Sequence, residues 1–211
     1  VEMFEFDPPA AVAVTCSMPL SLMGSWATTS ALRELGMTVI CGGRGFGPDG
    51  RWAHAVGADL WCPTFEDGAD ALIEALDQPR PAPREPVGDA DTVSEMHAIR
   101  RDGPTLVESA MSLSLTAWPW LRDSGDTVRA TRADLQSTLQ TAGSAMLADD
   151  PTLLDDYVQW FESVLAARDL PVEFVSTAFD LLLEVAPTHL PKLRAMLDHG
   201  LATCSKPPMA R

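Results

Sequence analysis

Two loop segments carry the most specific chemical signal in the chain. Ser17 and Leu20 follow the apolar run AVAVTC, and Gly42 and Gly43 end the next such run, MTVICGG. Charge-free runs of this kind are typical of buried parallel strands, and ligands of doubly wound sheets bind beyond the carboxyl ends of the strands. Paired glycines let a backbone approach a ligand closely. We therefore expect a cofactor site formed by Ser17, Leu20, Leu22, Gly42, Gly43, Arg44, Gly45 and Phe46.

The residue types in these loops favour a wide heterocycle over a pyrophosphate. A dinucleotide site needs the pattern G-x-G-x-x-G at the start of the helix that follows the first strand. The segment GGRGFG has its glycines at other offsets and follows the second apolar run. The alternative is that Gly42-Gly43 is only a tight turn in a small α/β sheet.

A second candidate constellation lies further along the chain. It combines a histidine, aromatic residues and arginines, namely His97, Trp118, Trp120, Tyr157, Trp160, Arg129 and Arg132. Aromatic planes pack on conjugated rings, and arginine binds carboxylates through two parallel hydrogen bonds. The set therefore fits a tetrapyrrole that carries propionate groups. The alternative is that these residues form an ordinary helical core.

Residues 1–78 alternate between strand and helix patterns. Strands are predicted over 11–16, 37–43 and 58–63, and helices over 21–36, 47–57 and 65–76. This alternation is typical of parallel βαβ units. A proline-rich stretch over 79–90 cannot continue a helix and is interpreted as a linker.

Residues 91–204 show helical periodicity throughout, followed by a tail over 205–211. Thr92 and Glu95 resemble a capping box, and Pro104 is expected to open a second helix. Asp149-Asp150-Pro151 predicts the end of one helix and the start of another, and Pro171 and Pro191 predict further starts. About six helices of this length predict a compact bundle or globin-like domain. The fold class is therefore α/β plus all-α.

Composition limits the partners and the compartment. The formal net charge of −15 and the pI of about 4.4 argue against nucleic acid or an anionic membrane as a direct partner. No apolar run is long enough to span a bilayer, and no secretory signal opens the chain. The four cysteines lack zinc-site spacing, so we expect reduced thiols, a cytoplasmic protein and no metal site. The motifs of serine hydrolases, P-loop proteins and zinc proteases are absent, so we do not expect an enzyme.

The two loop segments resemble those of cobalamin-binding Rossmann domains, in which a serine-x-leucine element and a double glycine line the site of the nucleotide tail. The run GGRGFGPDGRWAHAVGADLW is also similar to the later half of cobalamin domains in bacterial light sensors and methyltransferases. The family's Asp-x-His-x-x-Gly motif, whose histidine can ligate cobalt, is absent. The resemblance therefore implies a partial domain, completed by a segment that precedes Val1.

The order of the two parts resembles the photocobilins, photoreceptors that pair cobalamin with biliverdin in a globin-like helical domain. The resemblance implies a light-sensing module with adenosylcobalamin and biliverdin as cofactors. It further implies a light-driven change in cobalamin ligation that alters assembly, and a homo-oligomer. Two alternatives remain open, namely a corrinoid carrier for methyl transfer and a helical interaction module that binds no cofactor.

Overall fold

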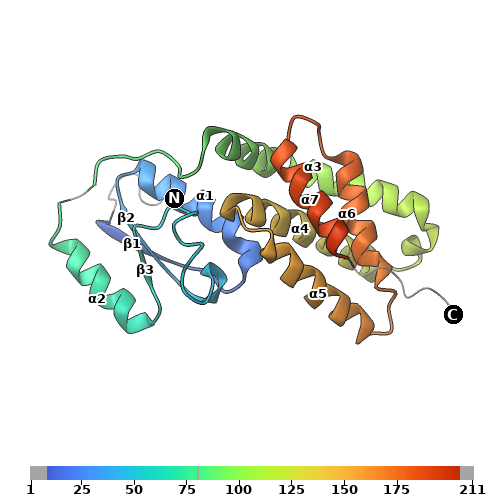
Figure 1. The fold of residues 1–211 in the computed structure, drawn as a ribbon, viewed down its shortest axis with the longest axis horizontal. Coiled ribbons are helices and arrows are strands. Elements are labelled where there is room, and N and C mark those ends of the chain that lie inside the picture. The colour runs from blue at the N-terminus through green and yellow to red at the C-terminus, as the bar shows by residue number, and fades with distance from the viewer. Residues whose placement is uncertain (1–8, 80, 205–211) are drawn as a thin grey trace. The chain divides into compact units, whose positions relative to one another are not determined.

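A computed structural model of the protein describes residues 9–79 and 81–204. The chain divides into two compact units, Val1–Val93 and Ser94–Arg211 (Figure 1). At a coarse level the predicted fold class is confirmed, because the chain combines a small parallel sheet with a set of helices.

The first unit is built on a three-stranded parallel sheet. The strands are β1 (Ala11–Thr15), β2 (Thr38–Gly42) and β3 (Leu60–Cys62), in the order β1-β2-β3. The register places Thr15 beside Gly42, so the loops after β1 and β2 leave the sheet at the same edge. Short 3-10 turns, η2 (Pro19–Ser21) and η3 (Arg44–Phe46), follow these two strands, and the helices of the unit are α1 (Leu22–Glu34) and α2 (Phe65–Leu76).

The helix expected over 47–57 is wrong. This segment is a series of turns, in which Gly50 and Gly57 take positive φ angles of 71° and 90°. Trp52, Ala53 and Val56 are buried, and their spacing imitates one face of a helix. The glycines favour turns over a helical conformation, so the segment forms an irregular loop. The three buried side chains hold this loop against the core.

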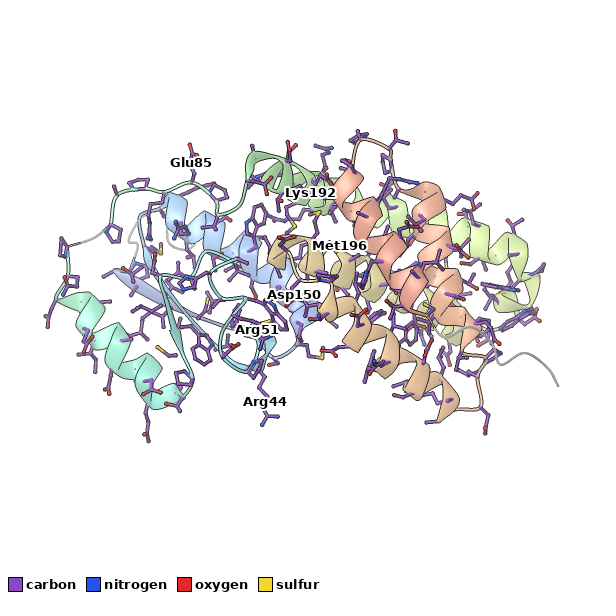
Figure 2. All side chains as sticks on the ribbon, viewed as in Figure 1. Arg44, Arg51, Glu85, Asp150, Lys192 and Met196 are labelled. Carbon is purple, nitrogen blue, oxygen red and sulfur yellow. The ribbon has the colours of Figure 1, made fainter. Side chains whose placement is uncertain are left out.

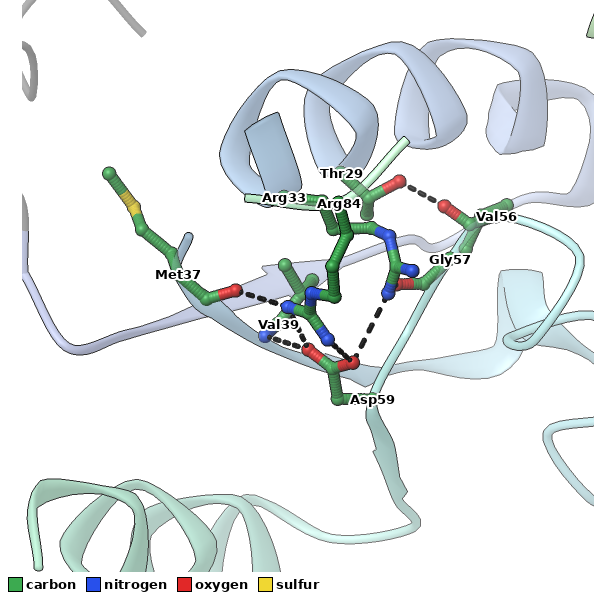
Figure 3. Close-up of polar contacts among 8 residues, drawn as sticks. All are labelled: Thr29, Arg33, Met37, Val39, Val56, Gly57, Asp59 and Arg84. Carbon is green, nitrogen blue, oxygen red and sulfur yellow. Dashed lines mark hydrogen bonds and ion pairs between the residues drawn. The ribbon is translucent and has the colours of Figure 1, made fainter. Parts of the chain in front are cut away.

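One carboxylate fastens three segments of this unit together (Figure 3). Asp59 accepts a hydrogen bond from the backbone N–H of Val39 at 2.8 Å and forms ion pairs with Arg33 and Arg84. Arg84 also donates to the carbonyl of Met37 at 2.7 Å. Arg84 belongs to the stretch interpreted as a linker from the sequence. Its contacts with Met37 and Asp59 bind this part of the stretch to the amino ends of β2 and β3.

The second unit contains most of α3 (Ala90–Ala117), and then η4 (Pro119–Asp123), α4 (Gly125–Ala148), α5 (Thr152–Ala166), α6 (Glu173–Val185) and α7 (Pro191–Thr203). The helix start expected at Pro104 is wrong, since α3 is one helix of 28 residues with Pro104 inside it. Proline removes one backbone hydrogen bond, but the buried Ile99 and Val107 on either side hold the helix in the core. The merger leaves five α-helices among the described residues of 90–204 instead of about six.

The expected junction between α4 and α5 is confirmed. Asp149 ends α4 in the left-handed conformation with φ 49°, and the Asp150 carboxylate accepts from the backbone N–H of Thr152 at 3.1 Å. Such an ending satisfies carbonyls that the helix leaves unpaired, and the aspartate satisfies an N–H of the next helix. α4 can therefore turn back and pack against α5.

The expected capping box at Thr92 and Glu95 is wrong. Asp89 caps α3 by accepting from the N–H of Thr92 at 3.0 Å, while Glu95 points into the core with 4% exposure. Its carboxylate accepts from the backbone N–H groups of Lys192 at 3.0 Å and Leu193 at 2.9 Å. Glu95 therefore caps the start of α7, about a hundred residues away in sequence, and joins α3 to α7.

No helix in the described parts of the chain has both the length and the apolar character that a bilayer crossing requires.

Glu95→Ala should lower the free energy of unfolding of the helical unit by about 2 kcal/mol, because two backbone N–H groups lose a charged acceptor. Denaturant titration followed by helical circular dichroism measures this loss. Glu173→Ala, at an exposed position in the first turn of α6, is the matched control and should change the value by less than about 0.5 kcal/mol. Equal effects of the two variants would contradict the capping role of Glu95.

Candidate functional site

The helical unit encloses an apolar cavity of about 390 Å³. Its walls come from the end of α3, from η4, from α4, α5 and α6, and from the segment that joins α5 to α6. They comprise Ser114, Trp118, Trp120, Leu121, Asp126, Thr127, Ala130, Thr131, Asp134, Leu135, Phe161, Leu165, Leu170, Phe174, Ala178 and Leu181. Trp120, Ala130 and Leu170 are exposed, so the cavity opens to solvent. Both its volume and its largely apolar lining are typical of small-molecule sites.

One face of α4 supplies the floor of this cavity. The lining residues of α4 occur as adjacent pairs, one pair in each successive turn. The pairs are Asp126 and Thr127, Ala130 and Thr131, and Asp134 and Leu135. This spacing places all six residues on one side of the helix. Asp126 and Asp134 are eight residues apart, or about 12 Å along the axis. The floor can therefore accommodate an elongated ligand.

Trp118, which precedes η4, and Trp120 within it pack against Phe174 of α6 in the cavity lining. The Trp118 and Phe174 rings lie 5.5 Å apart in an edge-to-face arrangement, and the Trp120 ring lies 6.2 Å from Phe174. Leu121, which is 3% exposed, anchors the turn that carries both tryptophans. Aromatic faces held in this way offer stacking surfaces to a flat ligand.

Asp134 is a charged group in an otherwise apolar wall. Its carboxylate is partly buried and makes no hydrogen bond or ion pair with any described residue. Desolvation by burial raises the pKa of Asp134, and the charge of Arg168 opposes this shift only in part. An ionised carboxylate without a partner is destabilised in such surroundings.

The two arginines proposed from the sequence do not line the cavity. Arg129 is paired with Asp126, and Arg132 binds Glu108 with a shortest distance of 2.6 Å. Both arginines lie on α4 at positions adjacent to the lining face. Among the described residues that line the cavity there is no Lys, Arg or His, so the charge of the cavity is acidic.

Of the aromatic candidates, only Trp118 and Trp120 line the cavity. Tyr157 is buried beside it in the core, where its hydroxyl lies 3.0 Å from that of Thr138 and where burial raises the pKa of Tyr157. Trp160 is 57% exposed on α5, and His97 is exposed on α3. The structure therefore does not bring His97, Tyr157 and Trp160 to the cavity.

The loop residues of the α/β unit do meet at one edge of the sheet. Gly45 donates its N–H to the carbonyl of Cys16 at 2.9 Å, and Gly43 has φ 105°. A Cβ on Gly43 would collide with that same carbonyl. The close approach of the two loops is therefore a structural reason for glycine at this position, independent of any ligand.

The remaining residues of this group divide by exposure. Ser17 is exposed, Leu20 and Gly42 are half-buried, and Arg44 extends away from the ribbon (Figure 2). Leu22 and Phe46 are completely buried and belong to the core. Of the predicted loop set, Ser17 and Arg44 present side chains to solvent at this edge.

The residues at these two sites can be compared with the cofactors that the resemblance implies. The cavity presents aromatic and apolar groups, while Asp126 and Asp134 would repel the carboxylates of a bilin. At the sheet edge Ser17 is exposed, but Cys16 occupies the space next to Gly43 and Gly45, where a cobalamin tail would lie. Within residues 9–79 and 81–204, no group of three or more His, Cys, Asp or Glu residues is arranged to hold a metal ion.

Neither a scan against models of known protein families nor a search of curated proteins finds a match to this chain.

The sequence reasoning missed Asp134 and Phe174, although a signal for Asp134 exists. Asp126, Ala130 and Asp134 recur every four residues on the same side as Leu135, so two carboxylates lie on a face that also carries apolar residues. Phe174 has no comparable signal, because its place opposite Trp118 depends on how α6 packs.

Asp134→Asn should raise the free energy of unfolding at pH 7 by about 1 kcal/mol, because the cost of an unpartnered charge disappears. A raised pKa means that the folded state binds the proton more tightly than the unfolded chain. Ionisation of Asp134 therefore lowers stability as the pH rises through the raised pKa. The advantage of the variant should shrink as the pH falls toward about 4, the ordinary range of aspartate.

Denaturant titrations at several pH values test this expectation. Asp126→Asn is the control, since Asp126 is exposed and already paired with Arg129. A destabilised Asp134→Asn variant at pH 7 would show that the carboxylate has a stabilising partner.

Proposed function

We propose that the chain is a light-sensing module whose helical unit binds a bilin of the biliverdin class in the cavity beside η4. The observation that carries this proposal is the aromatic cavity itself, with Trp118, Trp120 and Phe174 around an open apolar space of about 390 Å³. A bilin supplies the absorption of red light when it is bound. The protein supplies flat apolar walls, which restrict the conformation of the rings and exclude water.

The carboxylates of such a pigment would lie at the cavity mouth. Arg129 and Arg132 flank the lining face of α4 and are engaged in surface ion pairs with Asp126 and Glu108. Exposed ion pairs of this kind contribute about 0–1 kcal/mol each, so a pigment carboxylate can replace the protein carboxylate at little cost. In this arrangement the pyrrole rings of the pigment enter the cavity, and its carboxylate side groups remain in solvent.

The α/β unit would contribute one side of an adenosylcobalamin site. In this proposal the unit is the later half of a cobalamin-type Rossmann sheet and the helical unit is globin-like. The sequential strand order β1-β2-β3 and the meeting of the Ser17 and Gly43 loops at one sheet edge support it. The Asp-x-His-x-x-Gly motif that would supply a cobalt ligand does not occur in the sequence. Adenosylcobalamin supplies a light-labile cobalt–carbon bond, whose loss would alter assembly.

A second candidate function is that of an interaction module, which one specific observation favours. α2 exposes Phe65 at 91%, Ile73 at 62% and Leu76 at 68%, although a helix beside a sheet usually buries its apolar residues. Exposed apolar surface of this kind marks sites of protein association.

Biliverdin mixed with the full chain should remain bound through gel filtration and show a shifted red absorption band. Ala130→Trp should abolish retention, because its ring would occupy the mouth of the cavity. Ala133→Trp is the matched control, since Ala133 is an exposed alanine on the same helix that does not line the cavity. Its retention should equal that of the unmodified chain.

Retention by neither the unmodified chain nor Ala133→Trp would overturn the bilin assignment and leave the interaction module. Equal retention by Ala130→Trp would place the pigment elsewhere. Adenosylcobalamin is tested in the same way with the full chain. Ser17→Trp, a change at an exposed position, should weaken its retention.

A further inference from the structure

We infer that the cavity of the helical unit selects a flat aromatic ligand with a positively charged nitrogen, and that Asp134 binds this charge. The inference rests on the cavity being a ligand site, as the proposed function does. It goes beyond the bilin assignment, because it specifies a positive charge for the part of the ligand that enters the cavity.

The first argument is the distribution of charge. Asp126 and Asp134 are the only charged residues among the described lining residues. Asp126 is exposed at the mouth and is neutralised by Arg129. Asp134 has no hydrogen-bond or ion-pair partner among the described residues. The net electrostatic preference of the interior is therefore for a cation.

The second argument is the state of the neighbouring polar groups. The Thr131 hydroxyl donates to the carbonyl of Thr127 at 3.0 Å, and the Ser114 hydroxyl donates to the carbonyl of Ala110 at 3.0 Å. These hydroxyl protons are committed to backbone carbonyls within their own helices. Since no described residue donates a hydrogen bond to the Asp134 carboxylate, a ligand or solvent is left to supply a donor.

The third argument is the chemistry of the opposite wall. Trp118, Trp120 and Phe174 line the same cavity as Asp134, and aromatic faces attract cations as well as flat rings. The charge of Arg168 lowers the pKa of Asp134 and so opposes the effect of burial, but the two residues form no ion pair. An ammonium group bound at Asp134 would thus give this carboxylate a direct ion-pair partner, which Arg168 does not.

The length of the floor limits the shape of the ligand. Asp134 lies about 12 Å along α4 from Asp126 and about 6 Å from Ala130, which is exposed at the mouth. A molecule of two fused rings with a short ammonium arm fits this geometry, with the arm directed to Asp134 and the rings between Phe174 and α4. A ligand that also carries carboxylates must keep them outside the cavity.

Isothermal titration calorimetry of the full chain with three matched probes tests the inference. The probes are 2-naphthylmethylammonium, the neutral 2-naphthylmethanol and the anionic 2-naphthoate. The ammonium should bind at least about tenfold more tightly than the alcohol, a difference of about 1.4 kcal/mol, and the carboxylate should bind most weakly. Asp134→Asn should abolish the difference between ammonium and alcohol, whereas Asp126→Asn should retain it.

The outcomes separate this inference from the proposed function. Equal binding of ammonium and alcohol by the unmodified chain, or an ammonium preference that survives in Asp134→Asn, would overturn the inference alone. Binding of none of the three probes would overturn both the inference and the assignment of the cavity as a ligand site. Biliverdin retention together with no charge preference would leave the bilin proposal standing.

Discussion

The helical unit depends on the buried carboxylate of Glu95, which receives the first backbone N–H groups of α7. A helix start leaves such groups unpaired and partly positive, so a buried acid is an effective partner. α7 in turn packs against α4, α5 and α6, the helices that form most of the cavity wall. Leu193 and Leu197 on α7 are completely buried in this core. Glu95 therefore fixes the start of the helix that packs against α4, α5 and α6.

Glu95 and Asp134 show what distinguishes a structural carboxylate from a binding one. Both lie on helices of the same unit. Glu95 is 4% exposed, whereas Asp134 is half-buried. The protein satisfies Glu95 with two N–H groups, whereas it leaves Asp134 facing an apolar space. Because burial without a partner is costly, the second arrangement is retained at the expense of stability. A ligand that supplies the missing donor would recover that cost on binding.

The sequence predicted the elements that local pattern determines. The three strands, the helix over 65–76 and the turn at Asp149 follow from alternation, capping and breaker residues. The segment 47–57 and Pro104 were misjudged, because buried side chains determine their conformations against local preference. At the candidate site, the sequence named Trp118 and Trp120, which line the cavity, and Arg129 and Arg132, which form surface ion pairs beside the lining face of α4. The glycines after β2 were found, yet their contact with Cys16 depends on the approach of two loops, which spacing alone does not reveal.

Hydrogen–deuterium exchange of the full chain, with and without biliverdin, measures most directly whether the helical cavity is the ligand site. Occupation should slow amide exchange in residues 118–135 and 170–181, which supply most of the lining, and leave residues 65–76 unchanged. Unchanged exchange in the lining segments, with slowing confined to the α/β unit, would contradict the assignment of the cavity as the pigment site.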